Sequence, residues 1–242
     1  MIKTNWFTDS SQVLLDKYFG GADMRASANG IYLVAHSDTV FTREPKEDEI
    51  LKCFGIWTAL KTGLGADNRV GLWTVWMMMK EFADCGFIIS QDEEKGDITI
   101  KNDLLRLDTE ITYPKLFISF DRRGMSNYVD YDNYCLKIKN KLADMKIKRE
   151  YGTYSTVSFL SEYFGIPCVN LCICAENFHS KAEWWDSRAY KRNLYKYKEF
   201  IRWAIEQDDF EIEEDPYMPV YNYKNFYNWQ QSCYKDNGYL IF

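Results

Sequence analysis

The sequence predicts an α/β fold in which a mostly parallel central sheet is flanked by helices in a single domain. From Gly30 onward, short apolar runs of strand length alternate with segments of helical length, which is the pattern of βαβ units. The chain has 242 residues, of which 46% are hydrophobic, so it is long enough to bury one large core. This composition excludes the disordered and fibrous classes of protein.

The predicted strands are four short apolar runs. They are IYLVAH (31–36), GFIIS (86–90), LFISF (116–120) and CVNLCIC (168–174). We interpret the cysteines of the last strand as small buried apolar residues and not as metal ligands.

The predicted helices lie before and between these strands. Apolar side chains within residues 13–19 mark one face of a short helix. Residues 70–82 have helical length and few helix-breaking residues, and residues 155–164 end at the stop Gly165-Ile166-Pro167. Residues 182–205 form a further predicted helix that is rich in aromatic residues.

A shift in composition after the last helix divides the chain into two parts. We place one domain at residues 1–206 and a C-terminal extension at residues 207–242. The extension begins with the acidic run QDDFEIEEDPY and then becomes rich in Tyr, Phe, Trp and Asn. We expect its aromatic rings to pack back onto the domain. A segment for self-association or substrate lining is the alternative.

Charge and cysteine content limit which partners and which cellular compartment are expected. The net charge of −6 argues against nucleic acid as a partner, because nucleic-acid affinity depends largely on Lys and Arg. Seven scattered cysteines indicate a reducing compartment, and the N-terminus lacks the pattern of an export signal. No apolar stretch approaches the roughly 20 residues that span a bilayer. We therefore expect a cytoplasmic protein without membrane contact.

The two histidines of the chain, His36 and His179, each lie where a predicted strand gives way to a loop. Ligand sites in open α/β sheets form beyond the carboxyl ends of the strands, where distant segments converge. Either histidine alone is more simply explained as a structural residue. However, similar loop positions hold carboxylates, namely Asp67, the acidic run Asp92-Glu93-Glu94, and Asp121.

Two imidazoles and several carboxylates form a ligand set suited to Zn²⁺, and also possible for Mn²⁺ or Co²⁺. Two metal ions can share such a set when one carboxylate bridges them, and Asp67 is the candidate bridge. In the adjacent pair Glu93-Glu94, one carboxylate can bind metal while the other moves a proton. A site of this kind hydrolyses amide bonds.

Five segments occur in a characteristic order along the chain. They are AHSDTVF, TGLGADNRVGL, DEE, SFDRRG and the block GTYSTVSFLSEYFGIPCVNLCICAENFHSKAE. Together they resemble the motifs of the di-zinc exopeptidase superfamily, which includes co-catalytic aminopeptidases and peptidase T-like peptidases. The resemblance extends from Gly30 to Ile205.

The resemblance implies a role for each residue of the set. His36 would be a ligand and Asp38 would orient it, while Asp67 would bridge the two metal ions. In the DEE segment, Glu93 would be the general base and Glu94 a ligand. The family pattern pairs His36 with Asp121 on one metal ion and Glu94 with His179 on the other. Asn68 stands where the family has a second aspartate, and the short spacing between motifs leaves no room for a separate lid domain.

Both kinds of side chain that could hold a peptide end are present. Arg122 and Arg123 directly follow Asp121, and Arg69 follows the bridging segment, so an anionic group of the substrate could bind there. The alternative is that they balance the carboxylates or face solvent. Glu176 and Glu183 could instead bind a substrate amine.

The sequence therefore predicts a metal-dependent hydrolase that cleaves a peptide or amide bond with two metal ions, most simply an exopeptidase. An aminopeptidase and a di- or tripeptidase both remain open. Two alternatives are an amidase for N-acyl amino acids and an inactive relative that binds peptides or a partner protein. The expected partner is a peptide or small amide substrate, and a homo-oligomer stays open.

Overall fold

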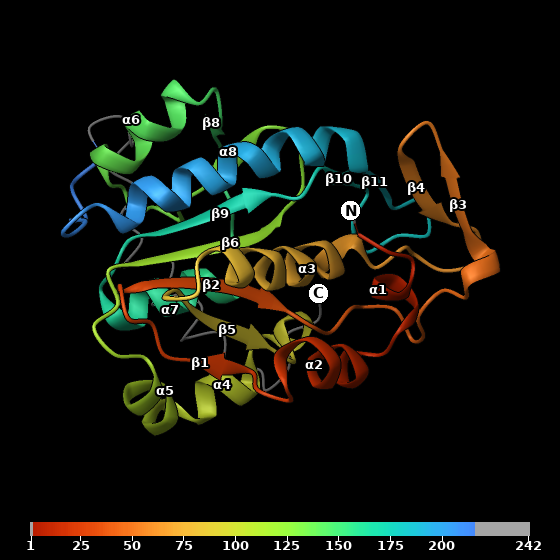
Figure 1. Ribbon diagram of the computed structural model, residues 1–242, viewed down its shortest axis with the longest axis horizontal. Coiled ribbons are helices and arrows are strands. Elements are labelled where there is room, and N and C mark those ends of the chain that lie inside the picture. The colour runs from red at the N-terminus through yellow and green to blue at the C-terminus, as the bar shows by residue number, and fades with distance from the viewer. Residues whose placement is uncertain (1, 216–242) are drawn as a thin grey trace, which may run out of the picture.

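The computed structural model describes residues 2–215. The aromatic-rich part of the predicted extension, residues 216–242, lies outside the described residues, as does Cys233. Within the described part, the α/β fold with a mostly parallel central sheet is confirmed (Figure 1).

The central sheet has seven strands in the order β1-β5-β2-β6-β9-β7-β8. Its core is the parallel set β5-β2-β6-β9, and the register pairs Val34 of β2 with Ile88 on one side and Ser119 on the other. The edges are irregular, because β1 and β7 run antiparallel to their neighbours β5 and β9. The strands are β1 (Met24–Arg25), β2 (Ile31–His36), β5 (Gly86–Ser90), β6 (Leu116–Arg122), β7 (Asn127–Val129), β8 (Lys148–Arg149) and β9 (Cys168–Cys172).

Helices cover both faces of this sheet. On one face, Leu33 and Ile118 pack with residues of α3 (Ala66–Glu81) and α8 (Ser187–Ile205). On the other face, Val34 and Phe117 pack with α4 (Ile98–Asn102), α5 (Leu104–Glu110) and α7 (Thr156–Phe164). The alternation follows from the two-residue period of a strand, and both faces are apolar, as expected for a parallel sheet. The remaining helices are α1 (Asn5–Thr8), α2 (Ser11–Phe19) and α6 (Leu136–Asp144).

A second, four-stranded antiparallel sheet, in the order β10-β11-β4-β3, was not predicted from the sequence. It joins a hairpin of β3 (Ile50–Cys53) and β4 (Ile56–Ala59) to β10 (Ala175–Glu176) and β11 (Trp184–Asp186). Pairing of β11 with β4 brings the loop of His179 next to the segment that leads into α3.

Local chemistry explains where the helices begin and end. The hydroxyl of Ser10 accepts the N–H of Val13 before α2, and that helix ends at Gly20 in the left-handed region. The last helix begins at Ser187 and not at Ala182, because Trp184–Asp186 pairs as strand β11 with β4. Asp186 then caps α8 by accepting the N–H groups of Arg188 and Ala189.

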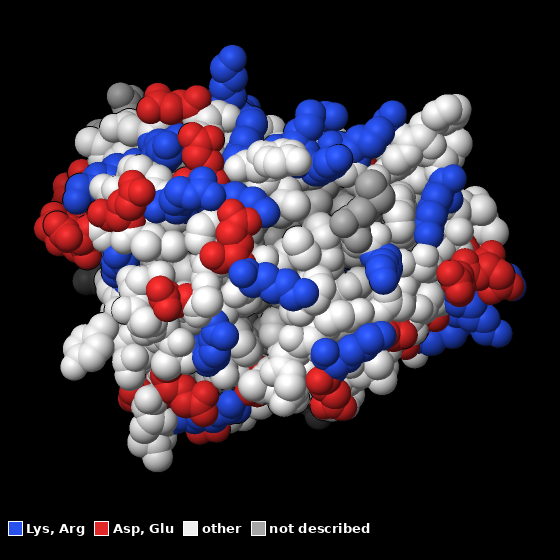
Figure 2. Space-filling model, in the orientation of Figure 1, with Lys and Arg blue, Asp and Glu red and all other residues white. Residues whose placement is uncertain are grey.

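The surface carries both signs of charge. On the face in Figure 2, Lys and Arg side chains follow α8 along the upper part, while Asp and Glu side chains lie among and beside them. Residues after the proposed boundary at 206 also contact the domain: Phe210 is buried against Trp203, and the N–H of Glu213 donates to the carbonyl of Tyr134. The boundary itself stays a prediction. No helix among residues 2–215 is long and apolar enough to cross a membrane.

Candidate metal centre

The predicted ligands converge at the carboxyl edge of the central sheet. His36 is the last residue of β2, and Asp121 lies near the end of β6. Glu93 and Glu94 follow β5 in a short 3-10 turn (Glu93–Lys95), while Asp67 opens α3. His179 comes from the loop between β10 and β11. The structure thus brings together all five residues expected to bind metal.

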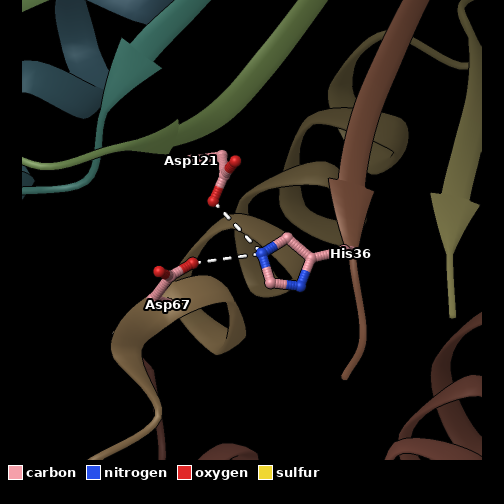
Figure 3. Close-up of side chains that lie close together, drawn as sticks. All are labelled: His36, Asp67 and Asp121. Atoms are coloured by element: carbon pink, nitrogen blue, oxygen red, sulfur yellow. Dashed lines mark hydrogen bonds and ion pairs between the residues drawn. The ribbon is translucent and has the colours of Figure 1, made fainter. Parts of the chain in front are cut away.

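His36 faces two carboxylates. Its Nε2 lies 3.0 Å from Oδ1 of Asp67 and 3.3 Å from Oδ1 of Asp121 (Figure 3). On the other side of the ring, Nδ1 lies 3.1 Å from Oδ1 of Asp38. Asp38 therefore fixes the orientation of the imidazole and leaves Nε2 directed at the other two carboxylates.

His179 faces the other oxygen of the same aspartate. Its Nε2 lies 3.1 Å from Oδ2 of Asp67 and 3.2 Å from Oε1 of Glu94. Each oxygen of Asp67 therefore faces a different histidine, with Asp121 beside the first and Glu94 beside the second. A carboxylate in this position has the geometry of a bridge between two metal ions.

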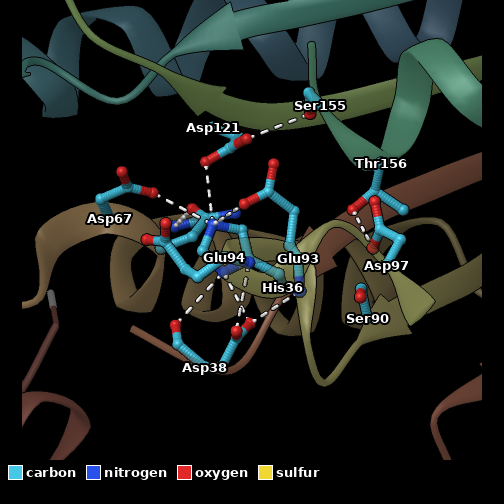
Figure 4. Close-up of polar contacts among 12 residues, drawn as sticks. His36, Asp38, Asp67, Ser90, Glu93, Glu94, Asp97, Asp121, Ser155 and Thr156 are labelled. Carbon is cyan, nitrogen blue, oxygen red and sulfur yellow. Dashed lines mark hydrogen bonds and ion pairs between the residues drawn. The ribbon is translucent and has the colours of Figure 1, made fainter. Parts of the chain in front are cut away.

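Asp38 also holds the acidic pair in place (Figure 4). Its two oxygens accept the backbone N–H groups of Glu93 and Glu94, each at 3.2 Å. The Glu93 carboxylate lies 3.9 Å from Nε2 of His36, and no side-chain hydrogen bond ties it down within residues 2–215. This carboxylate is free to move a proton.

The carboxylates lie close enough to shift one another's pKa values. Burial, with Asp121 and Asp67 nearby, raises the pKa of Glu93 to about 8. Burial and the charge of Asp67 raise the pKa of Asp121 to about 7. The pKa of Asp67 is lowered despite its burial, because both histidines hydrogen-bond to it.

In both histidines the surroundings favour the charged form. A hydrogen bond to Asp67 and the Glu94 carboxylate beside it raise the pKa of His179 to about 10. The pKa of His36 is raised well above its ordinary value, since the nearby aspartates outweigh its burial. Both shifts show that the cluster attracts positive charge.

The donor set fits divalent metal ions. Among residues 2–215, no Lys or Arg forms an ion pair with Asp67, Glu93, Glu94 or Asp121. The Oε1 atom of Glu94 is buried and lacks a hydrogen bond of good geometry. Residues 2–215 contain three groups in which the candidate ligand atoms all lie within 4.8 Å of one another. They are His36-Asp67-Asp121, His36-Glu93-Glu94 and Asp67-Glu94-His179. Nitrogen and oxygen donors at this spacing suit Zn²⁺, Mn²⁺ or Co²⁺.

The predicted substrate-binding arginines lie beside the cluster without touching it. Arg122 donates to the carbonyl of Tyr151 at 3.1 Å and lies 3.5 Å from Glu150. Arg123 is exposed. Neither makes a hydrogen bond or ion pair with a candidate ligand in the described part of the chain. Arg69 is buried and donates to the Ser11 hydroxyl and the Glu44 carboxylate.

The contacts that Ser155 and Glu183 make at the site were not predicted from the sequence. Ser155, just before α7, donates its hydroxyl to Oδ2 of Asp121 at 3.1 Å. Glu183, considered above for an amine, is buried and accepts backbone N–H groups of Gly65 and Asp67. Burial raises the pKa of Glu183 to about 7 although these N–H groups favour its carboxylate form. Its partners are 118 and 116 positions away, so no local pattern could have revealed them.

No protein-family model matches the sequence, and no curated protein matches it. Solved structures do resemble it. A tripeptidase of Staphylococcus aureus has a TM-score of 0.59 at 14% identity, covering 76% of this chain and 84% of its own. Aminopeptidase PepT of Bacillus cereus has the same score and identity, covering 81% and 93%. A chain of PhTET1-12s, whose structure is a dodecamer in the asymmetric unit, has a TM-score of 0.55 at 12% identity, covering 86% and 100%.

At 12% to 14% identity, these similarities establish a shared fold. The chain shares the α/β fold of these solved structures, and the alignments extend over most of it. The chemistry of the site has to be argued from its own residues.

Proposed function

We propose that this chain is a metal-dependent exopeptidase that uses two divalent metal ions, most simply Zn²⁺. The observation that carries the proposal is the Asp67 carboxylate, whose two oxygens each face a histidine that has a further carboxylate beside it. The peptidase-type fold supports the same conclusion.

The residues divide into two ligand groups. His36 and Asp121 would hold one ion, Glu94 and His179 would hold the other, and Asp67 would bridge them. When bound, the ions would polarise the carbonyl of the scissile bond and make water a nucleophile near neutral pH. Asp38 keeps Nε2 of His36 directed at the ligand position by holding Nδ1.

Glu93 has the position of a general base. Its carboxylate lies 3.9 Å from Nε2 of His36 and makes no hydrogen bond within residues 2–215, so it can accept a proton from the attacking water. The same group then returns the proton to the leaving amine, which balances the hydrolysis. Arg122 and Arg123 remain candidates to bind the carboxylate of a peptide substrate.

We further propose a cytoplasmic protein whose catalytic domain spans residues 1–206. The similar TET1 structure is a dodecamer, so we also consider a homo-oligomer of this chain. Analytical ultracentrifugation measures its oligomeric state. A peptide or small amide is the proposed substrate.

A substitution of the base tests the proposal. Purified protein reloaded with Zn²⁺, Mn²⁺ or Co²⁺ is assayed on aminoacyl, dipeptide, tripeptide and N-acyl amino acid substrates. We expect Glu93→Gln to lower kcat by about 10²- to 10⁴-fold while its metal content stays that of the wild type. Hydrolysis of N-acyl substrates alone would favour an amidase. Absence of turnover of every substrate by the metal-loaded wild type would contradict an enzymatic role.

A further inference from the structure

One buried carboxylate connects the loop of His179 to the start of α3. Glu183 follows His179 in the same loop and is fully buried. Its Oε2 accepts the N–H of Gly65 at 2.6 Å, and its Oε1 accepts the N–H of Asp67 at 3.2 Å. The backbone that presents the candidate bridge is therefore fixed by the loop that presents the second histidine.

The contact supplies what α3 lacks locally. The first N–H groups of a helix have no partner within the helix and favour an acidic acceptor. Gly65 occupies the N-cap position in the left-handed region, with no side chain to cap the helix. Glu183, from a distant part of the chain, provides the acceptor for the N–H groups at the start of α3.

The two histidines are supported in different ways. The ring of His36 is buried and oriented through Nδ1 by Asp38. The side chain of His179 is 55% exposed, and its Nδ1 has no hydrogen bond within residues 2–215. The placement of His179 therefore depends on its loop and not on an orienting side chain.

That loop has several anchors, and the anchor at Glu183 reaches the backbone of the metal centre. The carbonyl of Glu183 accepts a hydrogen bond from the Thr58 hydroxyl at 2.7 Å, which ties the loop to β4. Within the loop, Ser180 donates to the carbonyl of Asn177 at 2.8 Å. Within residues 2–215, His179 contacts the side chain of Asp67, and the Glu183 carboxylate contacts its backbone N–H.

We propose that Glu183 is a positioning residue that holds the His179 loop against Asp67, so that the Asp67-Glu94-His179 position is preformed before a metal ion binds. The inference rests on the proposed function, because it concerns the same pair of ions. Glu183 faces the backbone N–H groups of Gly65 and Asp67 and is not one of the proposed ligands. Replacing Glu183 is expected to weaken metal binding most at the position that contains His179.

Metal titration of the stripped full-length protein tests this role without relying on activity. Zn²⁺ is titrated by calorimetry with a competing chelator at mildly alkaline pH, into wild type, Glu183→Gln and His179→Ala. Glutamine keeps the size of the side chain but turns an NH₂ group toward a backbone donor. We expect the site lost in His179→Ala to bind about ten- to a hundredfold more weakly in Glu183→Gln.

A charge-matched control separates position from net charge. Glu211 is exposed and has no hydrogen bond or ion pair within residues 2–215, so Glu211→Gln should bind both ions as the wild type does. If Glu183→Gln melts at a lower temperature but keeps both affinities, Glu183 only stabilises the fold and the inference is wrong. If the wild type binds no metal ion, the proposed function fails as well, which is a separate result.

A second variant keeps the test decisive if Glu183→Gln does not fold. Glu183→Asp retains the charge but is one methylene shorter, so it cannot contact Gly65 and Asp67 together unless the loop moves. We expect it also to weaken the site that contains His179. Wild-type affinity at that site in Glu183→Asp would overturn the inference.

Discussion

Asp38 links the two halves of the candidate centre at the scale of single residues. It holds Nδ1 of His36 and accepts the backbone N–H groups of Glu93 and Glu94. An aspartate has enough lone pairs for all three contacts, whereas an asparagine has a single acceptor oxygen. The second carboxylate oxygen is therefore needed to hold the turn that carries the acidic pair.

Asp38→Asn is expected to weaken binding of the ion at His36 by about ten- to a hundredfold, because the ring and the acidic turn lose their support. Competition with a fluorescent zinc indicator measures this affinity. Asp48→Asn, in an exposed turn, serves as the control. Equal affinities in Asp38→Asn and the wild type would show that Asp38 does not position the ligands.

Residues at strand ends were predictable from the sequence, while those acting across the fold were not. His36 and Asp121 end apolar runs, so their place at the edge of the sheet follows from pattern alone. The partners of Glu183 are set by the pairing of β11 with β4, which leaves no signal in the residues nearby. The roles assigned to the ligands stay predictions that metal binding can test.

At the scale of elements, the packing of helices on the sheet positions the candidate ligands relative to one another. Gly71 lets α3 approach β6 closely: a Cβ at this position would lie 1.9 Å from the carbonyl oxygen of Phe120. This approach places Asp67, at the start of α3, beside Asp121, at the end of β6. A larger residue at Gly71 would separate the two carboxylates.

The helices behind the sheet provide a test of the packing. Leu107 of α5 is fully buried against the sheet, whereas Leu105 of the same helix is 78% exposed. We expect Leu107→Ala to lower the free energy of unfolding by about 2–5 kcal/mol. Leu105→Ala should change it by no more than about 0.5 kcal/mol. Urea denaturation measures both, and equal effects would contradict the packing described here.

Long apolar runs gave reliable strand predictions, and short elements did not. The four predicted strands correspond to β2, β5, β6 and β9, although β6 continues to Arg122 and β9 ends at Cys172 and not at Cys174. The hairpin β3-β4 was missed because most of β3 is exposed and lacks an apolar run. The strands β10 and β11 span two and three residues, too short to show a period.

At the scale of the whole molecule, the parallel sheet assembles a site from distant parts of the chain. Asp67 and His179 are 112 positions apart, yet their side chains lie within hydrogen-bond distance. The α/β fold and the convergence of strand ends followed from the sequence. The second sheet, which places the His179 loop, required the structure.

Metal content tests the central claim most directly. The protein is stripped, reloaded with Zn²⁺ near neutral pH and analysed for elements, alongside His36→Ala and His179→Ala. We expect about two ions per chain in the wild type and a partial loss in each variant, because each histidine serves a different ion. A reloaded wild type without stoichiometric metal would contradict a two-ion centre and favour a protein that binds peptides or a partner without catalysis.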